Sequence, residues 1–397
     1  MRTISVLATL TGRDRPGVTA AFFSALAAHD VDVRDVEQVV IRERMVLAVL
    51  LDLQGDPAAL RSSVTHAAQA LGMDCEVVIA DDPNSGRRPG HRSRSHVIVL
   101  GRPLRPGALS TVTQRIADLG ANIESIAQLS NEPASAVELL VSSEDPAGLR
   151  ATMVRAAEDS GVDIAVEPAG LRRRAKRLVV LDVDSTLIRD EGIDVLAARA
   201  GVGEQVADLT ARAMAGELDF ADALRERVGL LAGLPQAQVD AARDALQLTP
   251  GARTFVRTLR RLGFHVGVVS GGFTVFTDRF VAELDLDFAA ANELEVADGK
   301  LTGRVVGDVV DRAGKARALQ RFAEQFGVPL SQTVAVGDGA NDIDMLEAAG
   351  LGIAFNAKAA LRAAADTSVN LPYLDSVLFI LGISGEEIEE AAATVQR

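Results

Sequence analysis

The chain has 397 residues, of which 48% are hydrophobic, so it is long enough for two or three domains with cores of their own. Its net charge of −14 disfavours nucleic acid and anionic membrane surfaces as general partners. The single cysteine, Cys75, excludes an intrachain disulfide and a thiol-rich metal site.

The N-terminal segment alternates in hydrophobicity over residues 1–10 and then meets the charged residues 13–15, which predicts a strand and a turn. It lacks the continuous apolar stretch of a signal peptide, and no apolar run in the sequence reaches membrane-spanning length. We therefore expect a cytoplasmic protein that binds neither membrane nor nucleic acid.

An internal repeat with a constant offset of 90 residues occupies the N-terminal part of the chain. The segment Arg15-Pro16-Gly17 of the first copy falls on Arg105-Pro106-Gly107 of the second. Each copy shows the pattern strand, helix, strand, strand, helix, strand, which is the ferredoxin-like βαββαβ order. We place the two copies at residues 1–82 and 95–168. The predicted helices are 18–29, 57–71, 108–119 and 146–160.

The Arg-Pro-Gly turn before the first helix of each copy resembles that of ACT domains, small regulatory modules that bind amino acids where two modules pair. The copies are not equivalent, because Asp14 of the first is replaced by Leu104 in the second. The resemblance implies a homodimer through these domains and an amino acid bound near Asp14, Gly17 and Gly107. Alternatively, the modules serve only dimerisation and Asp14 is a turn residue.

Two basic stretches separate the predicted domains. Residues 81–95 are rich in Pro, Gly and Ser and contain four arginines, and residues 167–177 contain five basic residues. Because the whole chain is acidic, we expect both stretches to be solvated hinges, although either could grip an anionic partner.

An apolar strand at Leu178–Leu181 is followed by Asp182 and Asp184. Residues i and i+2 of an extended chain point to the same side, so both carboxylates face the crevice beyond the strand's carboxyl end. Two adjacent carboxylates repel unless a cation or a shared proton compensates them. The pair therefore indicates a hard metal such as Mg²⁺ and chemistry on an oxyanion.

Two further apolar strands also run into polar residues. The strand at 266–269 ends in Ser270, Gly271 and Gly272, whose backbone N–H groups can approach a phosphate closely. Lys315 stands near the start of a predicted helix. The strand at 333–336 is followed by Asp338, Asn341 and Asp342.

Together, these four motifs resemble those of the haloacid dehalogenase-like phosphohydrolases, in the same order and over residues 178–390. The resemblance implies a Rossmann-like α/β core at 178–397. It assigns Asp182 as the nucleophile that becomes an aspartyl phosphate and Asp184 as the general acid and base. Lys315 matches the lysine beside the phosphoryl group, and its place among only four lysines against thirty-seven arginines indicates that a compact charge is needed.

The same resemblance implies a Mg²⁺ site formed by Asp182, Asp338 and a backbone carbonyl at Asp184. Asp342 would support the metal site without binding the metal directly, and the alternative is that it caps its own helix. The groups assigned to the phosphate or the substrate in this core are Ser270, Gly271, Gly272 and Asn341.

Strand periodicity disappears between Thr186 and Pro250, where we predict helices at 193–200, 203–215, 220–231 and 235–246. An insertion here, about 190–248, resembles the small helical cap of phosphoserine phosphatases. The cap residues that this resemblance assigns to the substrate are Glu191, Met214, Phe220 and Arg227. Glu191 would bind an ammonium and Arg227 a carboxylate, and the alternative is that all four are ordinary cap residues.

The combined resemblance implies hydrolysis of O-phospho-L-serine to L-serine and phosphate, the last step of serine biosynthesis, with L-serine as the effector at the ACT domains. Two alternatives stay open. One is a related enzyme, either a phosphotransferase to an alcohol or a phosphatase for phosphoproteins. The other is an amino-acid-sensing regulator with a vestigial catalytic half, which the complete set of motifs disfavours.

Overall fold

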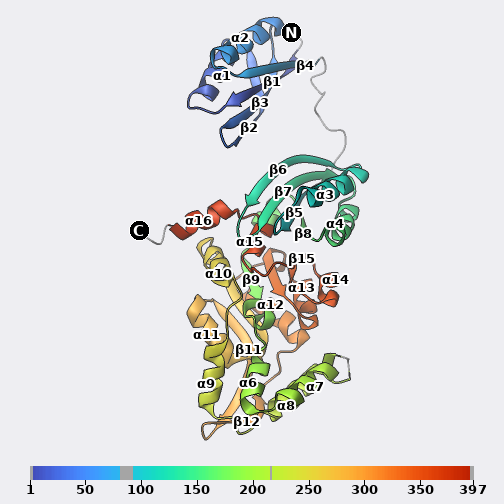
Figure 1. The fold of residues 1–397 in the computed structure, drawn as a ribbon, viewed down its shortest axis with the longest axis vertical. Helices are drawn as coiled ribbons and strands as arrows, with labels where there is room; N and C mark the ends of the chain where they lie inside the picture. The colour runs from blue at the N-terminus through green and yellow to red at the C-terminus, as the bar shows by residue number, and fades with distance from the viewer. Residues whose placement is uncertain (1–2, 81–92, 215–216, 394–397) are drawn as a thin grey trace. The chain divides into compact units, whose positions relative to one another are not determined.

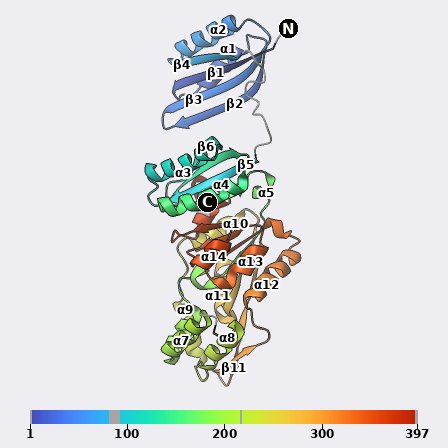
Figure 2. The same ribbon diagram turned by 90° about the vertical axis from the view of Figure 1, so that its right-hand side faces the viewer.

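The computed structural model describes residues 3–80, 93–214 and 217–393 (Figures 1 and 2). The chain divides into two compact units, Met1–His91 and Arg92–Arg397. Residues 81–92 of the first basic stretch lie outside the described part, so the expected hinge there stays a prediction. Among the described helices, none is long and apolar enough to cross a bilayer.

Unit 1 is an antiparallel sheet of four strands, in the order β2-β3-β1-β4. Alternate residues of β1, including Val6, Ala8 and Leu10, pack with Phe22 and Val64 of the two helices. The ferredoxin-like prediction is confirmed for this unit. Its elements are β1 (Ile4–Arg13), α1 (Val18–Leu26), β2 (Val31–Ile41), β3 (Arg44–Leu53), α2 (Pro57–Ala70) and β4 (Asp74–Ala80).

Strand β2 forms one edge of the unit 1 sheet and carries several exposed apolar side chains. Val33, Val39 and Ile41 are 51%, 53% and 71% exposed. An edge strand presents unpaired backbone groups that can pair with another chain. β2 is therefore the part of unit 1 best suited to association.

Unit 2 begins with a second ferredoxin-like module, with the strand order β6-β7-β5-β8. On β5, Val97 and Val99 pack on the module's own helices, whereas Ile98 and Leu100 join the core of the larger domain that follows. One face of the module's sheet therefore packs on its own helices, and the other face packs on the larger domain. Its elements are β5 (Ser93–Gly101), α3 (Pro106–Asp118), β6 (Asn122–Ser130), β7 (Ser135–Ser143), α4 (Pro146–Ser160) and β8 (Asp163–Pro168).

The second basic stretch is not a solvated hinge, which corrects the sequence-based expectation. It contains a short helix, α5 (Leu171–Arg174), and the side chain of Arg173 is only 9% exposed. Arg173 lies 2.6 Å from Glu138 of β7 and also donates to the carbonyl of Ile380. Lys176 is buried and donates to the carbonyl of Ser331. These cations are buried because the joint supplies carboxylate and carbonyl partners.

The larger domain contains a seven-stranded sheet, in the order β12-β11-β10-β9-β13-β14-β15. Neighbouring strands are parallel except β12, which pairs antiparallel with β11. This mixed sheet confirms the predicted Rossmann-like core. The strands are β9 (Leu178–Leu181), β10 (His265–Phe273), β11 (Phe288–Ala297), β12 (Lys300–Val306), β13 (Thr333–Gly337), β14 (Gly352–Phe355) and β15 (Thr367–Val369).

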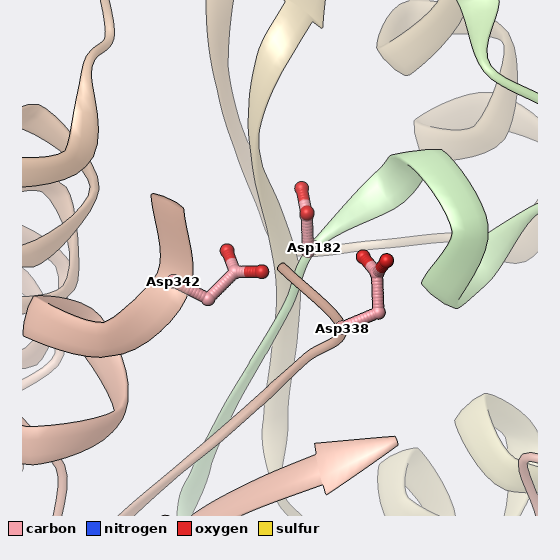
Figure 3. Close-up of side chains that lie close together, drawn as sticks. All are labelled: Asp182, Asp338 and Asp342. Atoms are coloured by element: carbon pink, nitrogen blue, oxygen red, sulfur yellow. The ribbon is translucent and has the colours of Figure 1, made fainter. Parts of the chain in front are cut away.

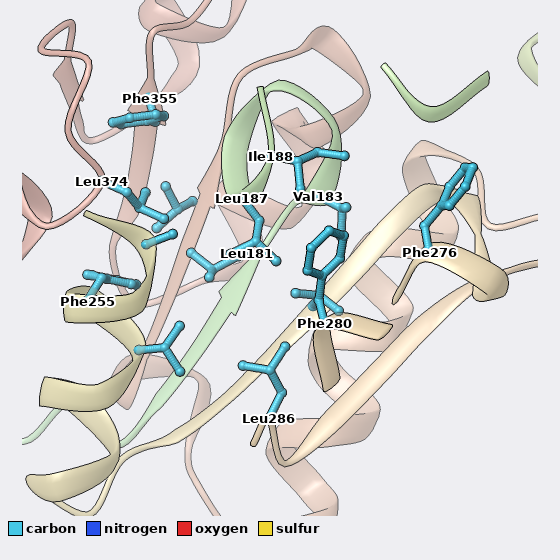
Figure 4. Packing of buried hydrophobic residues seen from close by; sticks show 14 of the residues in the cluster. Leu181, Val183, Leu187, Ile188, Phe255, Phe276, Phe280, Leu286, Phe355 and Leu374 are labelled. Atoms are coloured by element: carbon cyan, nitrogen blue, oxygen red, sulfur yellow. The ribbon is translucent and has the colours of Figure 1, made fainter. Parts of the chain in front are cut away.

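Helices cover both faces of this sheet (Figure 1). Val179 and Leu181 of β9 pack on one side with Phe255 and Phe280, as Figure 4 shows in part, while Val180 faces the other side. The helices on the first face are α10 (Ala252–Arg261), α11 (Thr274–Leu284) and α15 (Ser376–Ile380), and those on the second are α12 (Arg312–Gln325), α13 (Ile343–Ala348) and α14 (Ala359–Ala364). The remaining elements are η2 (Leu330–Gln332), η3 (Ala340–Asp342) and α16 (Gly385–Ala393).

Strand β9 lies between β10 and β13, and its register sets the position of the predicted site. Leu181 pairs with Val268 on one side and with Val336 on the other. The residues that follow these three positions therefore emerge at the same edge of the sheet. The next strands in the chain, β10 to β12, lie on one side of β9, and the later strands, β13 to β15, lie on the other. An open α/β sheet binds its ligand at the carboxyl ends of the strands at such a point.

The cap consists of α6 (Gly192–Ala200), α7 (Gly203–Met214), α8 (Phe220–Gly229) and α9 (Gln236–Ala245), which confirms the four predicted helices. Its two connections to the core run side by side. Ile188 and Leu248 form an antiparallel β-bridge, and the N–H of Arg189 donates to the carbonyl of Gln247 at 3.0 Å. The whole insertion therefore leaves and re-enters the core at one place.

Candidate active site

The chain leaves β9 through an irregular turn, η1 (Val183–Leu187), in which Asp184 is extended, with φ −64° and ψ 131°. Within it Ser185 has a φ of 57°, a left-handed conformation that is uncommon for a residue other than glycine. The hydroxyl of Ser185 donates to Glu191 at 2.8 Å. The turn therefore carries the chain from the strand to the cap and orients the first cap residue assigned to the substrate.

Asp182 is buried at the end of β9 and contacts a buried lysine. Its Oδ1 lies 2.7 Å from Nζ of Lys315 and accepts the N–H of Val183 at 2.7 Å. Burial, and next the neighbouring Asp342, raise the pKa of Asp182, while Lys315 opposes this rise. Burial alone would lower the pKa of Lys315, but the two carboxylates raise it, so the lysine is cationic.

Asp184 is held by one hydrogen bond to each carboxylate oxygen. Its Oδ1 accepts the N–H of Gly192 at 2.7 Å, and its Oδ2 accepts the hydroxyl of Ser270 at 3.1 Å. Burial raises the pKa of Asp184, against the effect of the Gly192 hydrogen bond. A carboxyl with a raised pKa is suited to donate a proton.

Three carboxylates form a cluster at this edge of the sheet (Figure 3). Asp182, Asp338 and Asp342 each offer an oxygen, and these oxygens lie within 4.8 Å of one another. Burial, followed by the charges of Asp342 and Glu191, raises the pKa of Asp338 to about 7. Crowded oxygen donors of this kind fit a hard divalent cation, which would offset their repulsion.

Asp342 is fully buried and both of its oxygens are already engaged. Oδ1 accepts from Lys315 at 2.7 Å, and Oδ2 accepts the N–H of Gly339 at 3.0 Å. Asp342 makes no side-chain capping bond to α13. The bond from Gly339 caps the short helix η3 and closes the turn after Asp338. Asp342 therefore caps its own helix, as the alternative expected, and also holds Lys315 next to Asp182.

Residues 270–272 form the irregular end of β10, where the register with β11 shifts between Val269 and Phe273, so the strand extends beyond the predicted residues 266–269. This segment, called the loop below, has little room for side chains. A Cβ on Gly272 would lie 2.7 Å from Oδ2 of Asp184, and one on Gly271 would lie 3.1 Å from the ring of Phe220. The N–H of Gly272 donates to the hydroxyl of Ser270 at 2.7 Å. Glycine at both positions therefore lets the loop backbone approach the site and lets the cap residue Phe220 pack on it.

Arg227 of α8 is held by its own cap. Its Nε donates to the carbonyl of Ala223 at 3.2 Å, and its Nη1 donates to the hydroxyl of Thr210 at 3.4 Å. Burial lowers the pKa of Arg227, while Asp194 and Glu191 oppose this. Burial and Asp184 raise the pKa of Glu191, against the hydrogen bond from Ser185. The cap thus presents one cationic and one acidic group to the core.

A cavity of about 570 Å³ lies between the cap and the core. Ser270, Lys315 and Asp342 are buried next to it rather than on its wall. Met214 is the last residue of α7, and its side chain lies outside the described part. The residues singled out in the sequence that line the cavity are Asp182, Asp184, Glu191, Phe220, Arg227, Gly271, Gly272, Asp338 and Asn341.

Two residues that line the cavity, Thr210 and Lys358, were not predicted from the sequence. Thr210 lines the cavity one helical turn before Met214, and that i, i+4 spacing was an available signal. Lys358 also lines the cavity, and its N–H donates to the carbonyl of Asp338 at 3.2 Å. The scarcity of lysine would have pointed to it as it pointed to Lys315.

The residues assigned to regulation lie at helix starts in the two modules. Asp14 lies in the turn before α1, where its N–H donates to Glu43. Gly17 precedes α1 with a φ of 93°, whereas Gly107 lies inside the first turn of α3 with no positive φ. The two Arg-Pro-Gly turns therefore align in sequence but differ in conformation.

Comparison with protein families places three domains along the chain. A haloacid dehalogenase-like hydrolase model matches residues 179–347, and ACT domain models match 5–78 and 93–167. Phosphoserine phosphatase of Streptomyces coelicolor is 54% identical over 98% of this chain and 94% of its own length. The chain belongs to the phosphoserine phosphatase family. SerB2, the phosphoserine phosphatase of Mycobacterium tuberculosis, is also 54% identical, over 98% of this chain and 96% of its own.

Solved structures of the family agree with the core described above. A phosphoserine phosphatase with a phospho-aspartyl intermediate analogue is 44% identical and superposes with a TM-score of 0.50, over 52% of this chain and 98% of its own. The family models and this structure together show the expected Rossmann-like core with two preceding ACT domains.

Proposed function

We propose that the chain hydrolyses O-phospho-L-serine to L-serine and inorganic phosphate, the last step of serine biosynthesis. The observation that carries this proposal is one cavity that is lined by Asp182 and Asp184 from the core and by Glu191 and Arg227 from the cap. The first pair suits a phosphoryl group, and the second suits the ammonium and carboxylate of an amino acid. Two relatives that match 98% of the chain are phosphoserine phosphatases.

Asp182 is the proposed nucleophile. Its Oδ1 is held by Lys315 and the N–H of Val183, so we assign Oδ2 as the oxygen that attacks phosphorus. As the Asp182–phosphorus bond forms, the bond to the serine oxygen breaks, and Asp184 gives that oxygen its proton. Asp184 then takes a proton from water, which attacks phosphorus and frees phosphate and Asp182. The phospho-aspartyl analogue of a related enzyme supports this route.

Mg²⁺ is the cation that we propose for the carboxylate cluster. Asp182, Asp338 and the backbone carbonyl of Asp184 would hold it, and Asp342 would support them from behind. When bound, the ion supplies positive charge to the carboxylates and phosphoryl oxygens. Lys315 supplies a fixed charge within the same cluster, because its ammonium is buried and lies 2.7 Å from an oxygen of Asp182 and of Asp342.

The core loop and the cap would divide substrate recognition between them. Ser270, Gly271 and Gly272 would bind phosphoryl oxygens, with Asn341 beside them. Glu191 would bind the ammonium and Arg227 the carboxylate of the substrate. Phe220 packs on Gly271, so the closed cap excludes water from this side of the site. Met214 would complete the apolar wall.

L-serine is the effector that we propose for the ACT domains, bound near Asp14, Gly17 and Gly107 in a homodimer. The exposed edge strand β2 supports association with a second copy. The apolar contact between the second module and the phosphatase core supports transmission of an effect between them. We propose the cytoplasm as the compartment, because a phosphorylated amino acid is too polar to cross a bilayer unaided.

Phosphate release from O-phospho-L-serine, with and without Mg²⁺, tests the proposal. A reaction quenched during turnover should carry a phosphoryl adduct on Asp182, detectable by mass spectrometry, and Asp182→Asn should abolish both adduct and turnover. Added alcohols should not accept the phosphoryl group in place of water. An adduct on another residue, or no hydrolysis of phosphoserine, would overturn the assignment.

A further inference from the structure

Asn292 of β11 is a buried amide to which the proposed reaction gives no role. Asn292 is 1% exposed. Its side chain makes three hydrogen bonds to backbone groups outside β11. Nδ2 donates to the carbonyls of Gly271 at 2.8 Å and Gly272 at 3.2 Å. Oδ1 accepts the N–H of Val310 at 2.7 Å. One side chain therefore uses both its donor and its acceptor on backbone groups near the site.

The two carbonyls belong to the loop that we assign to the phosphoryl group. In a planar trans peptide, the C=O of one residue and the N–H of the next point in opposite directions. Because Asn292 holds the carbonyl of Gly271, the N–H of Gly272 must point away from Asn292. It donates to the hydroxyl of Ser270, which in turn contacts Asp184 inside the site. The side chain of Asn292 thus orients the N–H of Gly272 towards Ser270 and Asp184.

The third hydrogen bond extends this effect to the catalytic lysine. Val310 precedes Asp311, which caps α12 by accepting the N–H of Gly314 at 2.6 Å. Lys315 is the next residue of that helix. Asn292 therefore connects the loop at the end of β10 with the start of the helix that carries Lys315.

We propose that Asn292 is a positioning residue of the phosphatase, which aims the N–H groups of the loop at the phosphoryl group and sets their distance from Lys315. The inference rests on the proposed function, since it concerns the same reaction. Asn292 does not line the cavity and acts through the residues that do. The simpler alternative is that its amide only satisfies three buried backbone groups.

Two substitutions separate positioning from structural support. Asn292→Leu removes all three hydrogen bonds, whereas Asn292→Asp keeps an acceptor for Val310 but places an anion against the two loop carbonyls. We expect both to lower kcat for O-phospho-L-serine about 10- to 100-fold, the scale for a misplaced catalytic group. The inhibition constant of orthovanadate should rise by a similar factor. KM should change less than kcat, because the contacts to the phosphoryl group are displaced while the cap contacts to the amino acid are untouched.

Thr333→Val is the matched control for lost stability. The buried hydroxyl of Thr333 donates to the carbonyl of Leu330 at 2.8 Å and accepts the N–H of Gly350 at 3.2 Å. These bonds lie at the start of β13, at the other end of the sheet from Asp338. We expect this variant to lower the melting temperature while kcat and vanadate inhibition stay as in the wild type.

The outcomes distinguish the inference from the proposed function. If the wild type is active and the Asn292 variants behave like Thr333→Val, Asn292 is structural and the inference is overturned alone. A wild type that neither hydrolyses phosphoserine nor binds orthovanadate would overturn the proposed function and the inference with it. If the Leu variant fails to fold, Asn292→Asp carries the test, because it is nearly isosteric.

Discussion

Nζ of Lys315 lies 2.7 Å from Oδ1 of Asp182, and both side chains are almost wholly buried. The same ammonium lies 2.7 Å from Asp342. One cation therefore offsets two carboxylates that would otherwise repel each other in a medium of low polarity.

Replacing Lys315 by Met keeps most of the volume and removes the charge. We expect kcat/KM for O-phospho-L-serine to fall by about 100-fold or more, because a fixed charge beside the phosphoryl group is lost. The free energy of unfolding should also fall, since Asp182 and Asp342 lose their counter-charge. Phosphate release and urea unfolding measure the two effects. Lys300→Met, an exposed lysine of β12, is the control, and equal losses in both variants would contradict the prediction.

Asp184→Asn should remove proton transfer while keeping the shape of the site. We expect kcat for O-phospho-L-serine to fall about 10²- to 10⁴-fold, the usual range for a lost general acid or base. With p-nitrophenyl phosphate, whose leaving group departs without a proton, Asp182 should still be phosphorylated. Stopped-flow absorbance should then show a burst of nitrophenolate equal to the enzyme concentration, followed by slow turnover. Equal slowing of both substrates with no burst would argue against this role for Asp184.

Arg227→Ala should weaken O-phospho-L-serine far more than phosphoethanolamine, which lacks the carboxylate. Loss of a charge-assisted hydrogen bond costs about 1.5–3 kcal/mol, so KM for phosphoserine should rise roughly 10- to 150-fold. Arg225→Ala is the control on the same helix, because Arg225 is exposed and pairs with Asp222. Steady-state kinetics with both substrates measure the difference. If KM rises equally for both substrates, Arg227 does not bind the carboxylate.

The regulatory proposal is best tested at Gly107. A side chain at Gly17 would be strained by its φ of 93°, whereas a Cβ on Gly107 meets open space at an ordinary φ. We expect Gly107→Ala to leave the melting temperature unchanged and to relieve inhibition by L-serine. Removal of residues 1–91 should relieve it as well. Unchanged inhibition in both variants would mean that L-serine acts only as a competing product.

Arg173→Met tests the joint between the second module and the phosphatase core. Burial would raise the pKa of Glu138, but hydrogen bonds from His96 and Arg173 lower it to about 2. A lowered carboxyl pKa adds stability above its unfolded pKa of about 4.5, and this stability is lost as pH falls towards 2. We expect Arg173→Met to cost about 3 kcal/mol at neutral pH and to start acid unfolding at a higher pH.

Urea unfolding across pH measures this change. Arg115→Ala is the control, because Arg115 pairs with Asp159 on the exposed surface of the same module. The prediction fails if the two variants unfold at the same urea concentration throughout the pH range.

Residues next to strand ends could be predicted from the sequence, because their positions follow from the strand itself. Asp182 and Asp338 each come just after an apolar strand, and Ser270 follows the apolar residues 266–269 of β10. The parallel register brings the three together. The same reasoning could not find Asn292. It lies after the Ala289–Ala291 segment of a strand, and its partners are backbone groups about 20 residues away along the chain.

The second basic stretch shows another limit. Local composition favours a solvated linker, and only the fold brings Glu138 and the carbonyls of Ile380 and Ser331 to Arg173 and Lys176. Charged residues can be buried when such partners exist. The conformations of Gly17 and Gly107 likewise depend on where each helix begins, which the shared Arg-Pro-Gly sequence does not determine.

Because Ile188 and Leu248 form a β-bridge, the cap is an insertion that can be exchanged as one segment. Since the inserted segment begins and ends at adjacent points, its length and sequence can change without moving β9 or the strands beside it. Asp182 and Lys315 would stay in place while residues 190–247 were replaced by a segment with other contacts. New substrates for this chemistry could thus be acquired by exchange of one contiguous stretch, provided that the new segment keeps the N–H that Gly192 donates to Asp184 and the backbone bonds that Gly233 and Leu234 make with Leu301.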